Sequence, residues 1–254
     1  MEKTVGFPSR PDFITYSFEN FGQVIKVSAD LEPEVFPYKV VVPLDGNFFQ
    51  SIYHRVYCGK NTTSADSGIL IERDAVIGTN DAGELMISNK VFEGSEYESL
   101  TDKTQKEMHQ HVNTLKSIPF PAGWRTFAHI HSHPLDDVVN HLLSYFSKTI
   151  PKVNGVPVTW TLGDFQSLLI SAALGHQGLT TSGLITQSQL GLMVASRTTI
   201  EALKSPSDEL RKIIESKKRT SDPPYKLFEK YGVILYGGNH FGRQKGEMQL
   251  QRLI

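Results

Sequence analysis

The stretch Ala128-His129-Ile130-His131-Ser132-His133-Pro134 places two histidines one residue apart, in a run that a proline closes. In an extended strand, residues i and i+2 project to the same face. His131 and His133 therefore point to one side, about 7 Å apart along the strand. This arrangement suits a zinc ion, which accepts imidazole nitrogens and needs at least a third protein ligand.

A third candidate ligand, Asp164, follows downstream. Apolar residues at helical spacing predict a helix over 164–174, and Thr161 is a good N-cap for it. A carboxylate in the first turn is favoured by the helix dipole. Two histidines and one carboxylate leave the fourth zinc position to water, as in hydrolytic sites. The alternative for His131 and His133 is a buried hydrogen-bonded pair, and the added carboxylate favours the metal.

The combination of His131-Ser132-His133-Pro134 with Thr161-x-x-Asp164 resembles the JAMM motif of the JAB/MPN metalloprotease family. The resemblance implies that both histidines and Asp164 bind zinc, and that Thr161 donates a hydrogen bond to the developing oxyanion. It also implies a zinc-dependent isopeptidase or peptidase, deubiquitinase-like, acting on a ubiquitin-like protein or peptide conjugate. The implied fold is α+β (α/β sandwich-like), a JAB/MPN-type mixed sheet packed between helices.

The chain departs from the motif at the general base. The family has a glutamate in a pattern like Glu-x-x-Gly-x-Leu, and aligning Gly68-Ile69-Leu70 with it puts Ala65 at the glutamate position. Alanine cannot take a proton from water. Three interpretations stay open: an engineered replacement of glutamate, a naturally inactive relative, or Asp66 as the base after a one-residue shift, which strand alternation disfavours. We predict a strand over 68–72, and Glu72 and Glu84 are poorer candidates because both lie beyond the start of that strand.

The spacer between the two halves of the motif is the other departure. Residues 134–160 separate His133 from Thr161, which is longer than the spacer of the resembled family. Apolar positions within 138–146 recur at helical spacing, so we predict an inserted amphipathic helix at about 135–157. Such a helix would shape a substrate groove, or it would only pack on the domain.

The chain divides into an N-terminal β-rich extension over 1–45 and a JAB/MPN-like metallopeptidase domain over 46–254. The extension could bind a partner, complete the sheet or block the groove. A glycine-rich stretch at 237–242 lacks the spacing of a phosphate loop, so we predict a flexible loop. The remaining patterns predict a helix over 48–57 and strands over 13–18, 24–27, 39–42, 75–78, 84–87, 125–131, 190–195 and 232–236.

Composition sets the broad class. The apolar fraction is 39% and the charged fraction 21%, as in globular proteins. The formal net charge is −1, which gives no reason to expect nucleic acid or an anionic membrane as a partner. A single cysteine, Cys58, excludes an internal disulfide and suits a reducing compartment. No apolar stretch approaches ~18 residues, and the N-terminus lacks the apolar core of a signal peptide, so we expect a cytoplasmic protein.

The expected function is therefore a JAMM-type hydrolase that requires Zn²⁺, in a chain inactivated at the general-base position, Ala65. The alternative is a catalytically inactive JAB/MPN scaffold that binds a protein partner. The sequence leaves the oligomeric state open.

Overall fold

The computed structural model describes twelve separate parts of the chain, and all structural statements below concern them: residues 15–17, 21–22, 24, 28–59, 73–93, 118–133, 152–153, 156–157, 160, 162–173, 179–215 and 225–254. Ala65, Asp66, Glu72 and Thr161 lie outside these described residues, as do the predicted strand at 68–72 and positions 138–146 of the predicted inserted helix.

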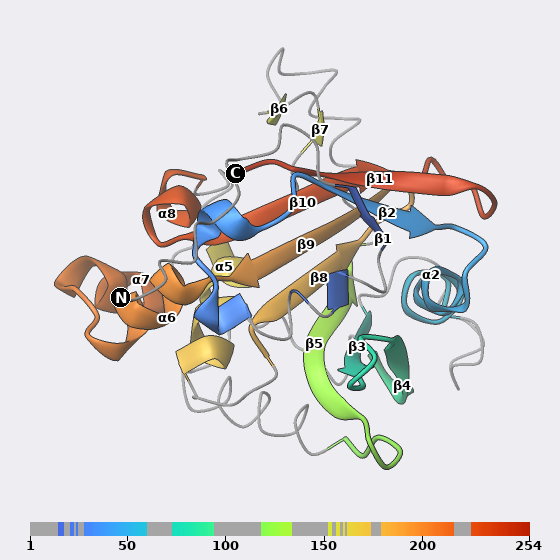
Figure 1. The fold of residues 1–254 in the computed structure, drawn as a ribbon, viewed down its shortest axis with the longest axis horizontal. Helices are drawn as coiled ribbons and strands as arrows, with labels where there is room; N and C mark the ends of the chain where they lie inside the picture. The colour runs from blue at the N-terminus through green and yellow to red at the C-terminus, as the bar shows by residue number, and fades with distance from the viewer. Residues whose placement is uncertain are drawn as a thin grey trace, which may run out of the picture.

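A nine-stranded sheet runs through the molecule in the order β1-β2-β11-β10-β9-β8-β5-β3-β4 (Figure 1). Its strands are β1 (Thr15–Ser17), β2 (Lys39–Pro43), β3 (Arg73–Thr79), β4 (Leu85–Glu93), β5 (Arg125–Ser132), β8 (Thr181–Ile185), β9 (Gln189–Ala195), β10 (Val233–Asn239) and β11 (Glu247–Arg252). The pairs β1–β2 and β5–β8 are parallel and the other pairs antiparallel. The sheet is therefore mixed, and the predicted α+β class is confirmed.

The helical elements are the 3-10 turns η1 (Ser28–Asp30) and η2 (Pro33–Val35), α2 (Asn47–Ser51), its continuation as the π-helix η3 (Ile52–Tyr57), α5 (Leu162–Ala173), α6 (Arg197–Lys204), α7 (Asp208–Glu215) and α8 (Tyr225–Lys230). A separate small hairpin pairs β6 (Lys152–Val153) with β7 (Val156–Pro157). No helix in the described part of the chain is long and apolar enough to cross a membrane.

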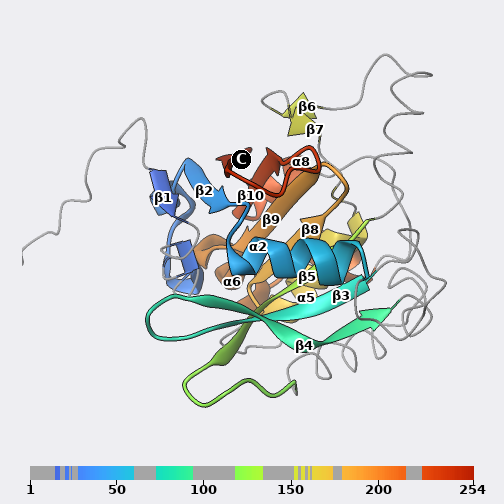
Figure 2. The same ribbon diagram turned by 90° about the vertical axis from the view of Figure 1, so that its right-hand side faces the viewer.

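Each face of the sheet is covered by its own helices and has its own apolar core. On one face, α2 and η3 pack Phe49, Ile52 and Val56 against the sheet, and Figure 2 shows this helix in front of the central strands. On the other face, α5, α7 and α8 contribute Phe165, Leu210 and Phe228. Alternation along each strand divides the side chains between the two cores. The helices on both faces give the expected sandwich-like layers.

The described part of the N-terminal segment completes the main sheet. Strand β2 pairs with β11 from Lys39↔Gln251 to Pro43↔Glu247, and β1 pairs with β2. Val40 and Val42 are buried in the same core as Phe49. Of the roles left open for this segment, completion of the sheet is thus the one that its described residues adopt.

Most predicted elements are present, and three predictions need correction. The predicted loop at 237–242 is wrong over Gly237–Asn239, which continue β10 because β9 pairs with them. Val24, the one described residue of the predicted strand 24–27, is helical. At the end of the predicted inserted helix, residues 152–153 and 156–157 form a hairpin, because Lys152 and Val153 pair with Pro157 and Val156.

We predict that Leu250→Ala lowers the free energy of unfolding by about 2–5 kcal/mol, because it removes a fully buried side chain of β11 and leaves a cavity. The matched control is Gln249→Ala, on the exposed face of the same strand, which should stay within about 0.5 kcal/mol. Chemical denaturation measures both. Equal effects of the two substitutions would contradict the placement of β11 in the sheet.

Candidate metal centre

A β-α-β unit brings the candidate ligands together. Strands β5 and β8 are parallel neighbours, and α5 lies between them in the chain. The chain leaves β5 at its carboxyl end, so a returning helix begins at that same end of the sheet. His131 and His133 therefore stand at the end of β5, next to Asp164 in the first turn of α5. The helix dipole favours the carboxylate at this position.

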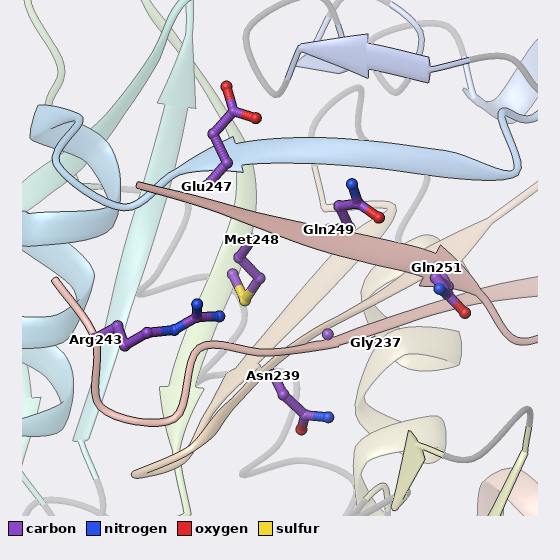
Figure 3. Close-up of a pocket in the computed structure, with 8 residues that line it drawn as sticks. Gly237, Asn239, Arg243, Glu247, Met248, Gln249 and Gln251 are labelled. Carbon is purple, nitrogen blue, oxygen red and sulfur yellow. The ribbon is translucent and has the colours of Figure 1, made fainter. Parts of the chain in front are cut away.

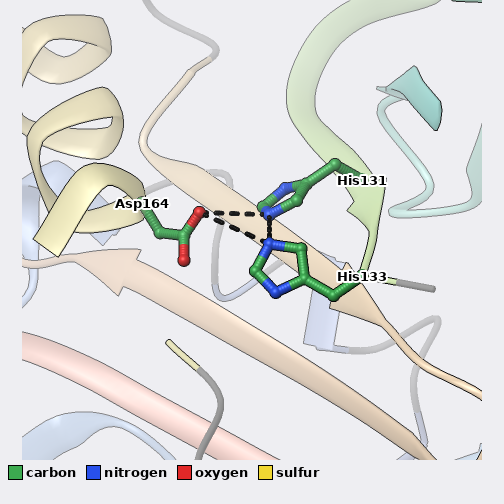
Figure 4. Close-up of side chains that lie close together, drawn as sticks. All are labelled: His131, His133 and Asp164. Carbon is green, nitrogen blue, oxygen red and sulfur yellow. Dashed lines mark hydrogen bonds and ion pairs between the residues drawn. The ribbon is translucent and has the colours of Figure 1, made fainter. Parts of the chain in front are cut away.

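The ligand atoms of the three residues converge on one point (Figure 4). His131 Nε2 lies 3.1 Å from His133 Nε2 and 3.1 Å from Asp164 Oδ1, and His133 Nε2 lies 3.9 Å from Asp164 Oδ1. A tetrahedral ion with bonds of ~2.0–2.1 Å separates its ligands by about 3.3 Å. The three side chains are 8%, 14% and 12% exposed. They form a nearly buried group that could hold a metal ion.

Neighbouring rings restrict the movement of His131. The His129 ring stacks beside it, with centroids 5.9 Å apart and planes 22° apart, and His129 Nε2 lies 3.0 Å from Ser182 Oγ. The Trp160 ring meets His131 edge-on at 6.4 Å. Trp160 in turn rests on Gly191, where an added Cβ would lie 3.0 Å from its ring. His129 is adjacent to the cluster but supplies no ligand atom to it.

Of the carboxylates considered from sequence as the general base, Glu84 is the one within the described residues. Glu84 lies at the β3–β4 turn, where its backbone N–H donates to Asn80 Oδ1. That turn follows Thr79, which pairs with Arg125 at the far end of β5 from His131. Glu84 is thus remote from the candidate ligands. Sequence reasoning missed Asp74, which is 4% exposed and pairs directly with His131.

A hollow of about 310 Å³ lies at strands β10 and β11, several strands away from the histidines (Figure 3). Cross-strand pairs connect it with the histidines in a single row, His131↔Leu184↔Gly191↔Gly237↔Gln251. Its lining consists of glycines, amide side chains, one thioether and two opposite charges: Gly237, Gly238, Asn239, Arg243, Glu247, Met248, Gln249 and Gln251. The hollow is thus polar and carries no net charge.

Comparison with protein-family models, with curated proteins and with solved structures gave no match. The class of the protein is therefore given by its own fold and site. It is an α+β protein whose described residues include one His-His-Asp group that could hold a metal ion.

We predict that the purified protein binds about one equivalent of zinc, and that His131→Ala, His133→Ala and Asp164→Ala each abolish tight binding by removing one of three ligands. Metal analysis after dialysis measures the stoichiometry. His54→Ala is the matched control, because His54 lies in η3 on the opposite face of the sheet. Less than about half an equivalent in the natural chain, or unchanged uptake by the Asp164 variant, would contradict the site.

Proposed function

We propose that this chain is a JAMM-type zinc metallopeptidase domain that acts on a ubiquitin-like protein or a peptide conjugate. The observation that carries the proposal is the convergence of His131, His133 and Asp164, whose sequence pattern resembles that family's motif. The mixed sheet with helices on both faces agrees with the architecture that the resemblance implies.

The donor set supports zinc over other common cations. Two imidazole nitrogens and one carboxylate oxygen suit Zn²⁺, whereas Ca²⁺ and Mg²⁺ prefer oxygen ligands alone. Three protein ligands also leave a position for a further group, as catalytic zinc sites do. When bound, zinc supplies Lewis acidity, which activates water and polarises a carbonyl group.

The chain's own residues hold the ligands and limit access of water. His131 and Asp164 come from a strand and a helix, so the backbone fixes their separation. Trp160 is 3% exposed and covers the side of His131 that faces β9. Thr161, directly before α5, is proposed to donate a hydrogen bond to the oxyanion of the cleaved carbonyl, as donors placed at developing charge do.

The polar hollow supports a polypeptide as the substrate. Asn239, Gln249 and Gln251 each carry an amide that donates and accepts hydrogen bonds, as peptide groups do. Four strand spacings separate β5 from β11, so the hollow lies about 19 Å from His131 along the row. An extended chain covers that distance with about six residues. We propose that a segment of the substrate away from the scissile bond occupies the hollow.

The rival proposal is a zinc-stabilised scaffold that binds a protein partner without cleaving it. Ala65 favours it, since alanine at the general-base position accepts no proton. The two proposals share the metal ligands and differ only in turnover.

We predict that Ala65→Glu raises the hydrolysis rate of ubiquitin-like fusions and peptides by about 10²–10⁴-fold, the usual contribution of a general base. Ala65→Gln is the matched control, because it adds a side chain of similar size that takes no proton. The double variant Ala65→Glu with Asp164→Ala should be inactive. Single-turnover cleavage assays measure all four proteins, the natural chain included.

Equal rates for the Ala65→Glu and Ala65→Gln variants, with zinc bound in both, would support the scaffold and contradict the enzyme. Fast cleavage by the natural chain would instead place the base elsewhere. Glu72→Gln is then the first variant to test, because Glu72 directly precedes β3, the strand paired with the His131 strand.

A further inference from the structure

We propose that Asp74 is a positioning residue for the metal ligand His131, and that its carboxylate accepts a hydrogen bond from His131 Nδ1. This inference rests on the metal centre of the proposed function. It adds a residue that the motif does not contain.

Strand register places the two side chains opposite each other. The pairing of β3 with β5 is unbroken through Asp74↔His131, Ala75↔Ile130 and Val76↔His129. Ala75 and Ile130 both lie in the core beneath α2 and η3. By alternation, Asp74 and His131 therefore share the opposite face, the one covered by α5. Directly paired residues have Cβ atoms about 4.5–5.5 Å apart, which allows a carboxylate to reach an imidazole nitrogen.

The orientation of His131 assigns its two nitrogens different tasks. Nε2 faces the candidate metal position, because it lies 3.1 Å from both His133 Nε2 and Asp164 Oδ1. A neutral imidazole that offers Nε2 to a metal carries its proton on Nδ1. Metal-binding histidines usually donate that proton to a carboxylate, a carbonyl oxygen or water. Asp74 is the carboxylate that the register brings to this histidine.

Burial makes the same pairing favourable for Asp74. The residue is 4% exposed, and a buried carboxylate is costly unless hydrogen bonds or charges compensate it. His129 and Trp160 restrict the plane of the His131 ring, but ring contacts do not choose between its two tautomers. An anionic acceptor at Nδ1 selects the tautomer with its proton on Nδ1, and it also makes Nε2 a stronger metal ligand.

The test measures zinc affinity of the full chain by competition with a chelator. Asp74→Ala should weaken zinc binding about 10–100-fold, and Asp74→Asn should weaken it less, because an amide oxygen still accepts a hydrogen bond. Asp81→Ala is the matched control: Asp81 is 90% exposed at the β3–β4 turn, and its removal should leave the affinity unchanged. Thermal unfolding of the metal-free proteins measures any structural effect separately.

Nitrogen NMR of the zinc-loaded natural chain tests the bond without a substitution. It should show a proton on His131 Nδ1, and that signal should shift in Asp74→Asn and not in Asp81→Ala. Normal zinc affinity of Asp74→Ala, or a His131 Nδ1 without a proton, would overturn the inference and leave the proposed function standing. A natural chain that binds no zinc would overturn both.

Discussion

The parallel pairing of β5 with β8 is the constraint on which the rest of the site depends. Because α5 returns the chain between these two strands, its first turn must lie at the carboxyl end of β5. Asp164 and His133 are 31 positions apart in number, yet they meet at this end of the sheet. The backbone topology places the candidate ligands, and the neighbouring rings of His129 and Trp160 restrict His131.

The same pairing gives the two faces of the sheet different characters. Around β5 and β8, the face beneath α2 and η3 is apolar, with Ile130 and Ile185 in its core. The face toward α5 carries the histidines, and further along the row it carries Gly191 and Gly237 in place of large side chains. The face toward α5 also has an apolar core, around Phe165 and Leu184, and the histidines stand beside it.

The three side chains that converge could be picked out from sequence, because their signal is local. Two histidines at alternate positions of a strand can be recognised without knowing the fold, and so can a carboxylate in the first turn of a helix. Asp74 could not be found in this way, since its importance comes from pairing with a strand more than fifty residues away. The same reason explains Gly237 and Gly238, whose composition suggests a loop but whose partners on β9 make them a strand.

Strand β11 shows a related limit. Its polar and apolar residues alternate over only six positions, and pairing with β2 and β10 gives Met248 and Leu250 a core to enter. The sequence pattern divides residues 1–45 from the rest of the chain as an extension. In the structure, β2 of this segment pairs with β11, so the two parts share one sheet. Local patterns did not indicate β11, whose stability comes from these distant partners.

Anomalous diffraction at the zinc edge, from crystals of the zinc-loaded protein, tests most directly whether His131, His133 and Asp164 hold the metal. We predict one strong peak at ~2.0–2.1 Å from Nε2 of both His131 and His133, and at ~2.0–2.2 Å from an oxygen of Asp164. A peak held by other residues, or no peak at this position in crystals that contain zinc, would contradict it.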